Sequence, residues 1–368
     1  MSISIVVGGQ FGSEGKGKTT SLLARDYGQG CAVVRCGGPN SGHIVHEHGR
    51  QYCFRLLPAG IVYGQRGFLA PAAVLDLHVL RDELREYEVS PKLFTVDPFS
   101  VVITEEHKKR ERTLRTAISS TGSGTGAATA AKVMRTPKTL LIKDVLNDNA
   151  WLSPYVRDVR SEINELIDQG FRIIIEGTQG FGLSLHHSRR FPQTTSKDTS
   201  AAQFVMETGL SPLLVDEVIM VIRTFPIRVA GAQSGALLGE TSWEDVRRES
   251  GYPHEIAEYT TVTRKIRRVG RFDLSLVLDA CQINRPTKLA VHGLDYLDYN
   301  NLGVSNYACL SDKAKRFLTM ITDSTGVPIL YAFTGRENSA VIRNPMNAEN
   351  QDRSTACSPG WIVNAALP

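Results

Sequence analysis

Residues 8–19 of the chain read Gly-Gly-Gln-Phe-Gly-Ser-Glu-Gly-Lys-Gly-Lys-Thr. They follow an apolar run, residues 3–7, and precede a segment, residues 20–27, that is expected to be helical. Glycines let a backbone approach a ligand closely, and the N–H groups at a helix N-terminus attract anions. Residues 12–19 also fit the phosphate-loop pattern G-x-x-x-x-G-K-[ST], with the strand before it and the helix after it that the pattern requires. A plain glycine-rich turn would explain neither lysine, so this stretch predicts phosphate binding.

The composition is that of a globular protein, since 42% of the 368 residues are hydrophobic and 22% are charged. The formal net charge of +4 suits phosphorylated small molecules and is too small to indicate a nucleic-acid partner. Apolar runs such as residues 218–222 are far too short to span a membrane. Because Met1 leads straight into the first predicted strand, we expect no signal peptide and a cytoplasmic location. The six cysteines form no CxxC pair, which favours unpaired thiols in a reducing compartment.

The order of the apolar segments predicts an α/β fold. Strands at 3–7 and 31–35 enclose the glycine loop and its helix, and such a βαβ unit implies a parallel sheet. Further strands are expected at 171–175, 215–222, 288–291 and 328–333, and helices at 74–88, 105–115, 154–169, 242–249, 274–284 and 312–322. We predict a single domain over residues 1–368, with a P-loop-like, mostly parallel central sheet flanked by helices and with smaller loop and helical excursions.

Four other segments have the composition of ligand-binding loops. Residues 35–43 form a second glycine-rich loop that ends in His43. Residues 119–126 precede an alanine-rich helix and read equally well as a flexible linker or as an anion-binding turn. Residues 176–180 follow a buried strand, where open α/β sheets place functional loops. Residues 260–268 combine threonines with closely spaced cations, which suggests an anionic ligand, although a solvated charged loop would have the same composition.

Taken in order, these segments resemble the signatures of the adenylosuccinate synthetase family. The family's opening loop, G-x-Q-W-G-D-E-G-K-G-K, fits residues 8–18 except at two positions, and its N-A-G-H signature fits residues 40–43. Its T-T-G-x-G-x-G-P signature with a downstream arginine fits residues 120–126 and Arg135, and its E-G-A-Q-G signature fits residues 176–180. Its arginine loop fits residues 260–268, and its T-K-L-D base-pocket signature is placed on residues 287–290. The matches run in order over nearly the whole chain.

The resemblance implies a ligase that forms a carbon–nitrogen bond. Such an enzyme phosphorylates the 6-oxo group of a purine nucleotide from a nucleoside triphosphate, and the amino group of L-aspartate then displaces this phosphate at C6. Positioning and charge neutralisation dominate phosphoryl transfer, which explains several separate anion-binding loops. By resemblance the catalytic residues are Ser13, Lys16 and His43, and His43 would hydrogen-bond or protonate the developing oxyanion at O6 or the transferring phosphoryl group.

The resemblance also assigns the binding residues. The triphosphate site would comprise Gly12, Gly15, Lys16, Gly17, Lys18, Thr19, Gly42, Lys288 and Gly335. The acceptor nucleotide site would comprise Ser13, Asn40, Thr121, Arg135, Gln179 and Thr195, with Arg135 supplied across the interface of a homodimer. The aspartate site would comprise Thr261, Val262, Thr263, Arg267 and Arg268. Mg²⁺ would bridge the phosphates, with Ser13 and the carbonyl of Gly42 among its ligands.

One departure from the family pattern concerns the acceptor base. The family has an aspartate where this chain has Ser13, and that aspartate removes the N1 proton of the purine and helps to bind Mg²⁺. A serine is no effective base at neutral pH without an activating partner, so Glu14 or water would have to take the proton. The smaller serine leaves room for the 2-amino group of a guanine and can accept a hydrogen bond from it. Ser13 therefore favours a guanine acceptor over hypoxanthine.

The second departure is Ala290. If the T-K-L-D signature lies at residues 287–290, this alanine replaces the aspartate that binds the guanine of the donor. Its loss would remove the preference for GTP and favour ATP or dATP. Both departures match the bacteriophage branch of the family, which makes 2-amino-2′-deoxyadenylosuccinate from dGMP, L-aspartate and ATP as a diaminopurine precursor for DNA; the chain would then work in the host cytoplasm. The alternatives are an adenylosuccinate synthetase that uses IMP and GTP, and a regulatory P-loop protein without ligase chemistry. The residues leave open how deoxyribose is preferred and whether ATP or dATP is used.

Overall fold

The computed structural model describes residues 2–260 and 264–347, and its centre is a nine-stranded sheet with β1 in the middle. Every neighbouring pair in this sheet is parallel except β14 and β15. In spatial order the strands are β15 (Val341–Arg343), β14 (Ile329–Phe333), β13 (Lys288–His292), β10 (Val215–Arg223), β1 (Ile3–Gly8), β9 (Arg172–Glu176), β2 (Cys31–Arg35), β5 (Arg66–Leu69) and β7 (Phe94–Val96). The expected mostly parallel sheet is confirmed.

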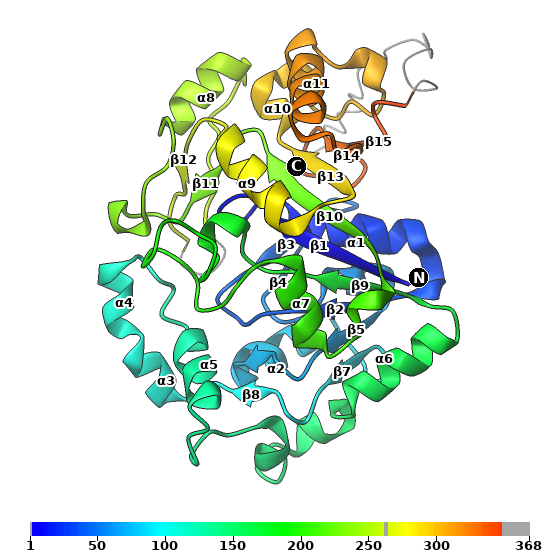
Figure 1. Cartoon of the computed structure of the whole chain (residues 1–368), viewed down its shortest axis with the longest axis vertical. Helices are drawn as coiled ribbons and strands as arrows, with labels where there is room; N and C mark the ends of the chain where they lie inside the picture. The colour runs from blue at the N-terminus through cyan, green and yellow to red at the C-terminus, as the bar shows by residue number, and fades with distance from the viewer. Residues whose placement is uncertain (1, 261–263, 348–368) are drawn as a thin grey trace, which may run out of the picture.

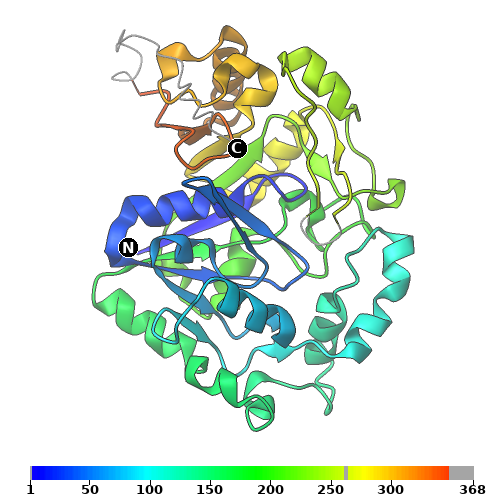
Figure 2. The same ribbon diagram turned by 180° about the vertical axis from the view of Figure 1, so that it is seen from behind.

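Helices cover both faces of the sheet (Figures 1 and 2). Alternate side chains of β1 point to opposite faces, as the period of a strand requires: Ile5 packs with one cluster and Val6 with another. The helix α1 (Lys16–Tyr27) contributes Leu22 and Leu23 to the Val6 side. The Ile5 side is covered by α6 (Val159–Asp168), α7 (Ala201–Thr208), α9 (Leu274–Asn284) and α11 (Asp312–Thr325).

The remaining elements lie around this core. The other helices are α2 (Leu77–Glu86), α3 (Glu105–Arg110), α4 (Arg112–Ala117), α5 (Thr125–Val133), α8 (Trp243–Ser250) and α10 (Leu294–Leu297). Short strand pairs are formed by β3 (His43–Glu47) with β4 (Arg50–Phe54), β6 (Val74–Leu75) with β8 (Val101–Val102), and β11 (Ile227–Arg228) with β12 (Arg268–Val269). The β3–β4 hairpin follows the second glycine-rich loop and places His43 at its first residue.

Three predicted helices begin or break at capping residues that the apolar periodicity does not reveal. The helix expected at 74–88 starts only after Asp76, whose carboxylate accepts the N–H of His78 at 3.0 Å, and the two residues before it form β6. The helix expected at 154–169 begins at Val159 behind a second aspartate cap, Asp158. The helix expected at 105–115 is broken at Glu111 into α3 and α4.

Glu111 also decides between the two interpretations of the loop at 119–126. Its carboxylate is buried and accepts the N–H groups of Gly124 at 2.7 Å and Ala127 at 2.9 Å, at the start of α5. The N-terminus of α5 is therefore satisfied by an anion of the chain itself, which orders the loop. The loop at 119–126 is therefore not a flexible linker, and the N-terminus of α5 is not a site for an external anion.

The cysteines correct another expectation. Cys31, Cys36, Cys53 and Cys281 are free, as predicted, whereas Cys309 is disulfide-bonded, so the prediction of unpaired thiols is wrong for that residue. Within the described ranges, no helix has both the length and the apolar character needed to cross a membrane.

Candidate functional site

The carboxyl ends of the central strands meet at one edge of the sheet, and two cavities lie there. Cavity A has a volume of about 770 Å³, and cavity B about 330 Å³. Cavity A lies beside the loops at 40–43 and 119–121, and cavity B beside the phosphate loop and the end of β13. The residues that line both are Ser13, Lys16, Gly42, His43 and Arg267. Two ligands bound side by side would meet at these residues.

The glycines of the phosphate loop make room for two histidines. Gly15 has φ 111°, in the left-handed region that a side chain disfavours, and a Cβ there would lie 2.4 Å from the ring of His292. A Cβ on Gly17 would lie 2.6 Å from Cβ of His43. The α1 N-terminus begins at Lys16, so the loop and the first helical turn together line cavity B.

The two lysines of the loop have different environments. Nζ of Lys16 pairs with Glu14 at 2.5 Å, and Glu14 also accepts the N–H of Gly12 at 2.7 Å. Glu14 is thus fully engaged and is no free base for the N1 proton, which removes one of the two candidates raised from the sequence. Lys18 donates to the carbonyl of Gly335 at 2.8 Å, and burial lowers its pKa to about 7. Because no carboxylate among the described residues forms an ion pair with Lys18, this lysine is a cation that a bound phosphate would compensate.

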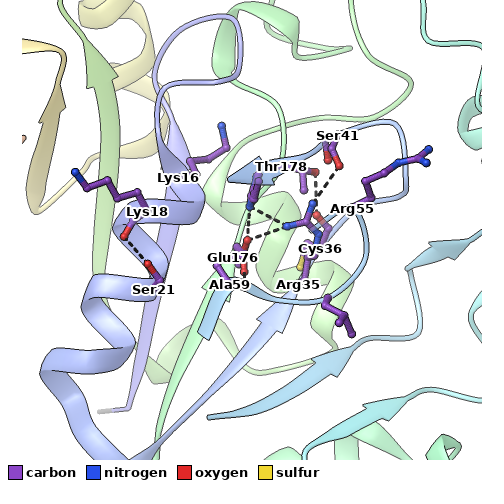
Figure 3. A network of polar contacts seen from close by, with 12 residues as sticks. Lys16, Lys18, Ser21, Arg35, Cys36, Ser41, Arg55, Ala59, Glu176 and Thr178 are labelled. Atoms are coloured by element: carbon purple, nitrogen blue, oxygen red, sulfur yellow. Dashed lines mark hydrogen bonds and ion pairs between the residues drawn. The ribbon is translucent and has the colours of Figure 1, made fainter. Parts of the chain in front are cut away.

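His43 belongs to a buried group of three charged or polar side chains, and the other two, Arg35 and Glu176, are labelled in Figure 3. Arg35 ends β2 and Glu176 ends the neighbouring β9, and Nη1 of Arg35 donates to Oε1 of Glu176 at 2.8 Å. The same carboxylate oxygen contacts Nδ1 of His43, and the other oxygen accepts the N–H of Ala59 at 2.7 Å. A carboxylate only accepts, so in the contact with Glu176 the hydrogen lies on Nδ1 of His43. Nη1 of Arg35, which is also 2.8 Å from Nδ1, then donates to Glu176, and Nε2 of His43 remains for a ligand.

This environment keeps His43 uncharged in the free protein. Burial lowers its pKa to about 4, and the neighbouring Arg35 and Lys16 act in the same direction against the attraction of Glu176. Although burial opposes it, contact with His43 and Arg35 holds the pKa of Glu176 below its usual value. Neutral His43 therefore presents a lone pair at Nε2, and a bound phosphate would favour its protonated form.

The predicted acceptor residues are distributed over cavity A and a neighbouring cavity C of about 340 Å³. Asn40 and Gln179 line both, Thr121 lines cavity A, and Thr195 lines cavity C. Arg135 follows the end of α5 with φ 53° and lines none of these three cavities. The structure thus brings all of these residues except Arg135 to one continuous region.

The predicted aspartate residues are only partly described. Thr261, Val262 and Thr263 lie outside the described residues. Arg267 lines both cavities A and B. Arg268 must be corrected, because its guanidinium pairs with Glu240, with Nε to Oε1 at 2.6 Å, and donates to backbone carbonyls. Two further cations of this loop also face the cavities, Lys265 in cavity A and Arg264 in cavity B, and the sequence assignment missed both.

The placement of the base-pocket signature at residues 287–290 is wrong. Lys288 lies at the amino end of β13 and pairs with Glu217 at 2.6 Å, and Ala290 is fully buried beneath α1. The carboxyl end of β13 reaches cavity B instead, where His292 and Asp295 line it. Asp295 accepts a hydrogen bond from the hydroxyl of Tyr252 at 2.5 Å. The rule that ligands bind at the carboxyl ends of parallel strands would have pointed to this later position.

The residues fit the Mg²⁺ that the resemblance implies. Within the described residues, no three His, Cys, Asp or Glu side chains gather as a metal-binding group. Mg²⁺, however, commonly takes only one or two protein ligands together with water and substrate phosphates. Ser13 and Gly42 both line the junction of cavities A and B, and their oxygens suit such a site. This ion would therefore be held mainly by the phosphates of a bound ligand.

The Arg35–Glu176 pair generates a prediction about stability. Glu176→Gln leaves the guanidinium of Arg35 buried without an opposite charge, and we expect a loss of about 3–5 kcal/mol in the free energy of unfolding. Urea unfolding measures this loss. The control is Glu83→Gln, because Glu83 is equally buried but accepts backbone N–H groups, among them that of Leu57 at 2.9 Å; we expect about 1–3 kcal/mol there. Equal losses in the two variants would contradict the importance of the ion pair.

Comparison with known proteins agrees with this geometry. A family model described as Adenylosuccinate synthetase matches residues 5–152 and 138–302. The chain is 39% identical to an adenylosuccinate synthetase of Methanocaldococcus jannaschii over 350 residues, which covers 93% of this chain and 96% of the relative. It is also 39% identical to the one of Thermococcus onnurineus over 348 residues, covering 92% of this chain and 97% of the relative.

Two solved structures have the same fold. Fully ligated adenylosuccinate synthetase from Plasmodium falciparum superimposes with a TM-score of 0.83 at 18% identity, covering 93% of this chain and all of that one. Cyanophage S-2L succinoaminodeoxyadenylate synthetase, bound to dGMP and dATP as an energy donor, superimposes with a TM-score of 0.77 at 28% identity, covering 93% of this chain and 95% of that one. The chain therefore belongs to the adenylosuccinate synthetase family and is a ligase of the type that forms carbon–nitrogen bonds.

Proposed function

We propose that the chain joins L-aspartate to C6 of dGMP at the expense of a nucleoside triphosphate. The junction of cavities A and B supports the reaction type. There the phosphate loop, which carries Lys16, meets the glycine-rich loop that ends in His43. Cavity B, beside the phosphate loop, would hold the donor. Cavity A would hold the acceptor nucleotide, with the attacking amine near Arg267. Such a junction places the γ-phosphoryl group next to O6, which is the positioning that phosphoryl transfer requires.

The reaction proceeds in two steps. In the first, O6 of the purine takes the γ-phosphoryl group while the N1 proton passes to water, and Lys16 and Lys18 stabilise the charge on the phosphates. Mg²⁺, when bound, neutralises phosphate charge. In the second, the aspartate amine attacks C6, the C6–O6 bond breaks, phosphate leaves with O6, and the amine loses a proton. His43, protonated at Nε2 beside the bound phosphates, donates a hydrogen bond to the oxyanion that develops at O6.

The choice of acceptor rests on Ser13. The curated relatives compared above are adenylosuccinate synthetases, and by themselves they favour IMP as acceptor and GTP as donor. Ser13, however, lines both cavities at their junction, where the family pattern has an aspartate. A hydroxyl there accepts a hydrogen bond from a guanine amino group and leaves room for it. The cyanophage protein that was bound to dGMP supports the same choice. IMP is the second candidate.

The identity of the nucleoside triphosphate donor is less narrowly defined than that of the acceptor. Ala290 does not favour ATP or dATP, because this residue lies in the core and reaches no ligand. Asp295 lines cavity B, and a carboxylate can accept hydrogen bonds from the N1–H and 2-amino groups of guanine. The cyanophage protein, in contrast, was bound to dATP. GTP therefore joins ATP and dATP as a candidate donor.

We also propose that the protein is a homodimer in which Arg135 completes the acceptor site of the partner. Arg135 follows two exposed apolar side chains, Val133 and Met134, which are 71% and 74% accessible. Met206, 61% accessible, lines cavity C together with Val133. An apolar patch of this kind beside an incomplete phosphate site supports a contact with a second copy.

The substrates are tested by one assay matrix. Purified protein receives aspartate and Mg²⁺ with IMP, GMP or dGMP, each crossed with ATP, dATP and GTP, and the products are identified by mass. We expect an aspartate adduct from dGMP. An adduct from IMP and none from dGMP would replace our proposal with the second candidate, and no adduct in any combination would indicate a nucleotide-binding protein without ligase activity.

Ser13→Asp should reduce kcat/KM for dGMP by at least about tenfold relative to IMP.

Lys18 generates a prediction about pH. Its pKa of about 7 in the free protein rises when a triphosphate binds, so Lys18 takes up close to one proton at pH 8 and little at pH 6. His43, which is neutral in the free protein, adds an uptake of its own when the phosphates favour its protonated form. Affinity should fall as the pH rises above about 7. Calorimetry in two buffers with different ionisation enthalpies measures the uptake, with a non-hydrolysable analogue of the donor that supports turnover. Lys18→Arg stays charged and should remove only the contribution of Lys18, so uptake at pH 8 should fall by close to one proton; equal uptake at pH 8 in both proteins would exclude Lys18 as a source.

The dimer proposal is tested by mixing two inactive variants. In a mixed dimer of Arg135→Ala and Lys16→Ala chains, one of the two sites has an intact Lys16 and receives an intact Arg135 from the other chain. After dissociation and reassociation of equal amounts, we expect recovery to about a quarter of wild-type activity. No recovery, with mixed dimers present by native mass spectrometry, would place Arg135 in its own subunit's site or outside any site.

A further inference from the structure

A buried arginine at the carboxyl end of β10 contacts two parts of the site that come from distant segments. Arg223 is 5% accessible, and its guanidinium lies between the phosphate loop and the segment that precedes residues 260–268. Nη1 donates to the carbonyl of Ser13 at 3.0 Å and to Oε2 of Glu258 at 3.1 Å. Nη2 donates to Oε1 of Glu258 at 2.5 Å. The two-step reaction assigns no role to this arginine.

The contact with Ser13 holds a strained position. Ser13 has φ 57°, in the left-handed region that a residue with a Cβ adopts only when its surroundings enforce it. The backbone of Arg223 is itself fixed to the same loop, because its N–H donates to Oε1 of Gln10 at 3.0 Å and its carbonyl accepts from Nε2 of Gln10 at 3.1 Å. Arg223 is thus a rigid support for Ser13, the residue that we propose to recognise the acceptor base.

The contact with Glu258 extends this support to the aspartate side. The carbonyl of Glu258 accepts the N–H of Arg267 at 2.8 Å, and Arg267 lines both cavities A and B. A bidentate arginine–carboxylate pair has a defined geometry, so a shift of Glu258 is transmitted to Arg223 and from there to Ser13. The chain of contacts from Ser13 through Arg223 and Glu258 to Arg267 is continuous.

We propose that Arg223 is a positioning residue that couples the acceptor-base loop to the aspartate loop, so that acceptor nucleotide and L-aspartate each strengthen the binding of the other. The inference rests on the proposed function for the identity of the two ligands. Its physical basis is that both ligands would hold the buried Arg223–Glu258 pair in one arrangement. Thermodynamic linkage then requires each ligand to raise the affinity for the other by the same factor.

The test measures the affinity for labelled L-aspartate by equilibrium dialysis, with and without acceptor nucleotide. The nucleotide is the one that the wild type converts, or dGMP and IMP in turn if it converts neither, so a failure of the proposed reaction does not prevent the measurement. We expect the nucleotide to raise wild-type affinity at least about fivefold, and Arg223→Lys to reduce this factor to near one. Lysine keeps the charge but cannot bridge Ser13 and both oxygens of Glu258.

Controls separate positioning from general damage. Arg271 and Glu249 form a comparable bidentate pair at the surface, with both distances 2.5 Å, so Arg271→Lys should leave the coupling factor unchanged. Glu258→Gln should reproduce the loss, and the double variant should lose no more than either single variant. If Arg223→Lys does not fold, by far-UV circular dichroism, Glu258→Gln carries the test. Wild-type coupling below twofold, unchanged coupling in Arg223→Lys, or losses that add in the double variant would overturn the proposal.

Discussion

The site depends on a single constraint: charged side chains buried at one edge of the sheet must find compensating partners. Arg35 and Glu176 satisfy each other across neighbouring strands, and Glu14 with Lys16 do the same within the phosphate loop. A buried charge that lost its partner would cost several kcal/mol, so each pair fixes the geometry around it. Lys18 is the exception. Its burial lowers its pKa, and a phosphate is the partner that its position implies.

These pairs explain why the candidate catalytic groups come from distant segments. Arg35, Glu176 and Arg223 are the last residues of three parallel strands, so the sheet aligns them before any loop is considered. The loops are then attached to these supports. His43 is held by Glu176, and Ser13 is held by Arg223. Residues of the loops that line the cavities are therefore positioned by residues at the ends of the strands.

Membership of the family and choice of substrate rest on different kinds of evidence. The family follows from matches that extend over most of the chain and from a shared fold. The acceptor base that we propose rests on one side chain at the junction of two cavities, Ser13, where the family pattern has an aspartate. A site that discriminates through hydrogen bonds depends on single polar groups, so in our proposal a change confined to one side chain is enough to alter the preferred purine. The overall likeness and the local residue therefore support different acceptors.

The sequence alone determined the class of fold and the phosphate loop, because both follow from local patterns. The apolar runs at 3–7 and 31–35 and the glycines between them could form little other than a βαβ unit. It also identified His43 and Ser13 through their loops. Helix boundaries that are set by capping residues were harder to predict from the sequence. Asp76 and Glu111 act through single hydrogen-bonded side chains, which leave no trace in the periodicity of apolar residues.

The tertiary structure decided which candidates reach the site. Lys288 and Arg268 have the right chemistry, yet Glu217 and Glu240 pair with them, and Ala290 lies in the core two residues before the end of its strand. Conversely, Arg35, Glu176, Arg223 and Asp295 belong to the site although no local motif assigned them a role. The physical reason is that a motif records residue types along the chain, whereas the partner of a buried charge comes from another strand. Only the packing of the sheet brings those two together.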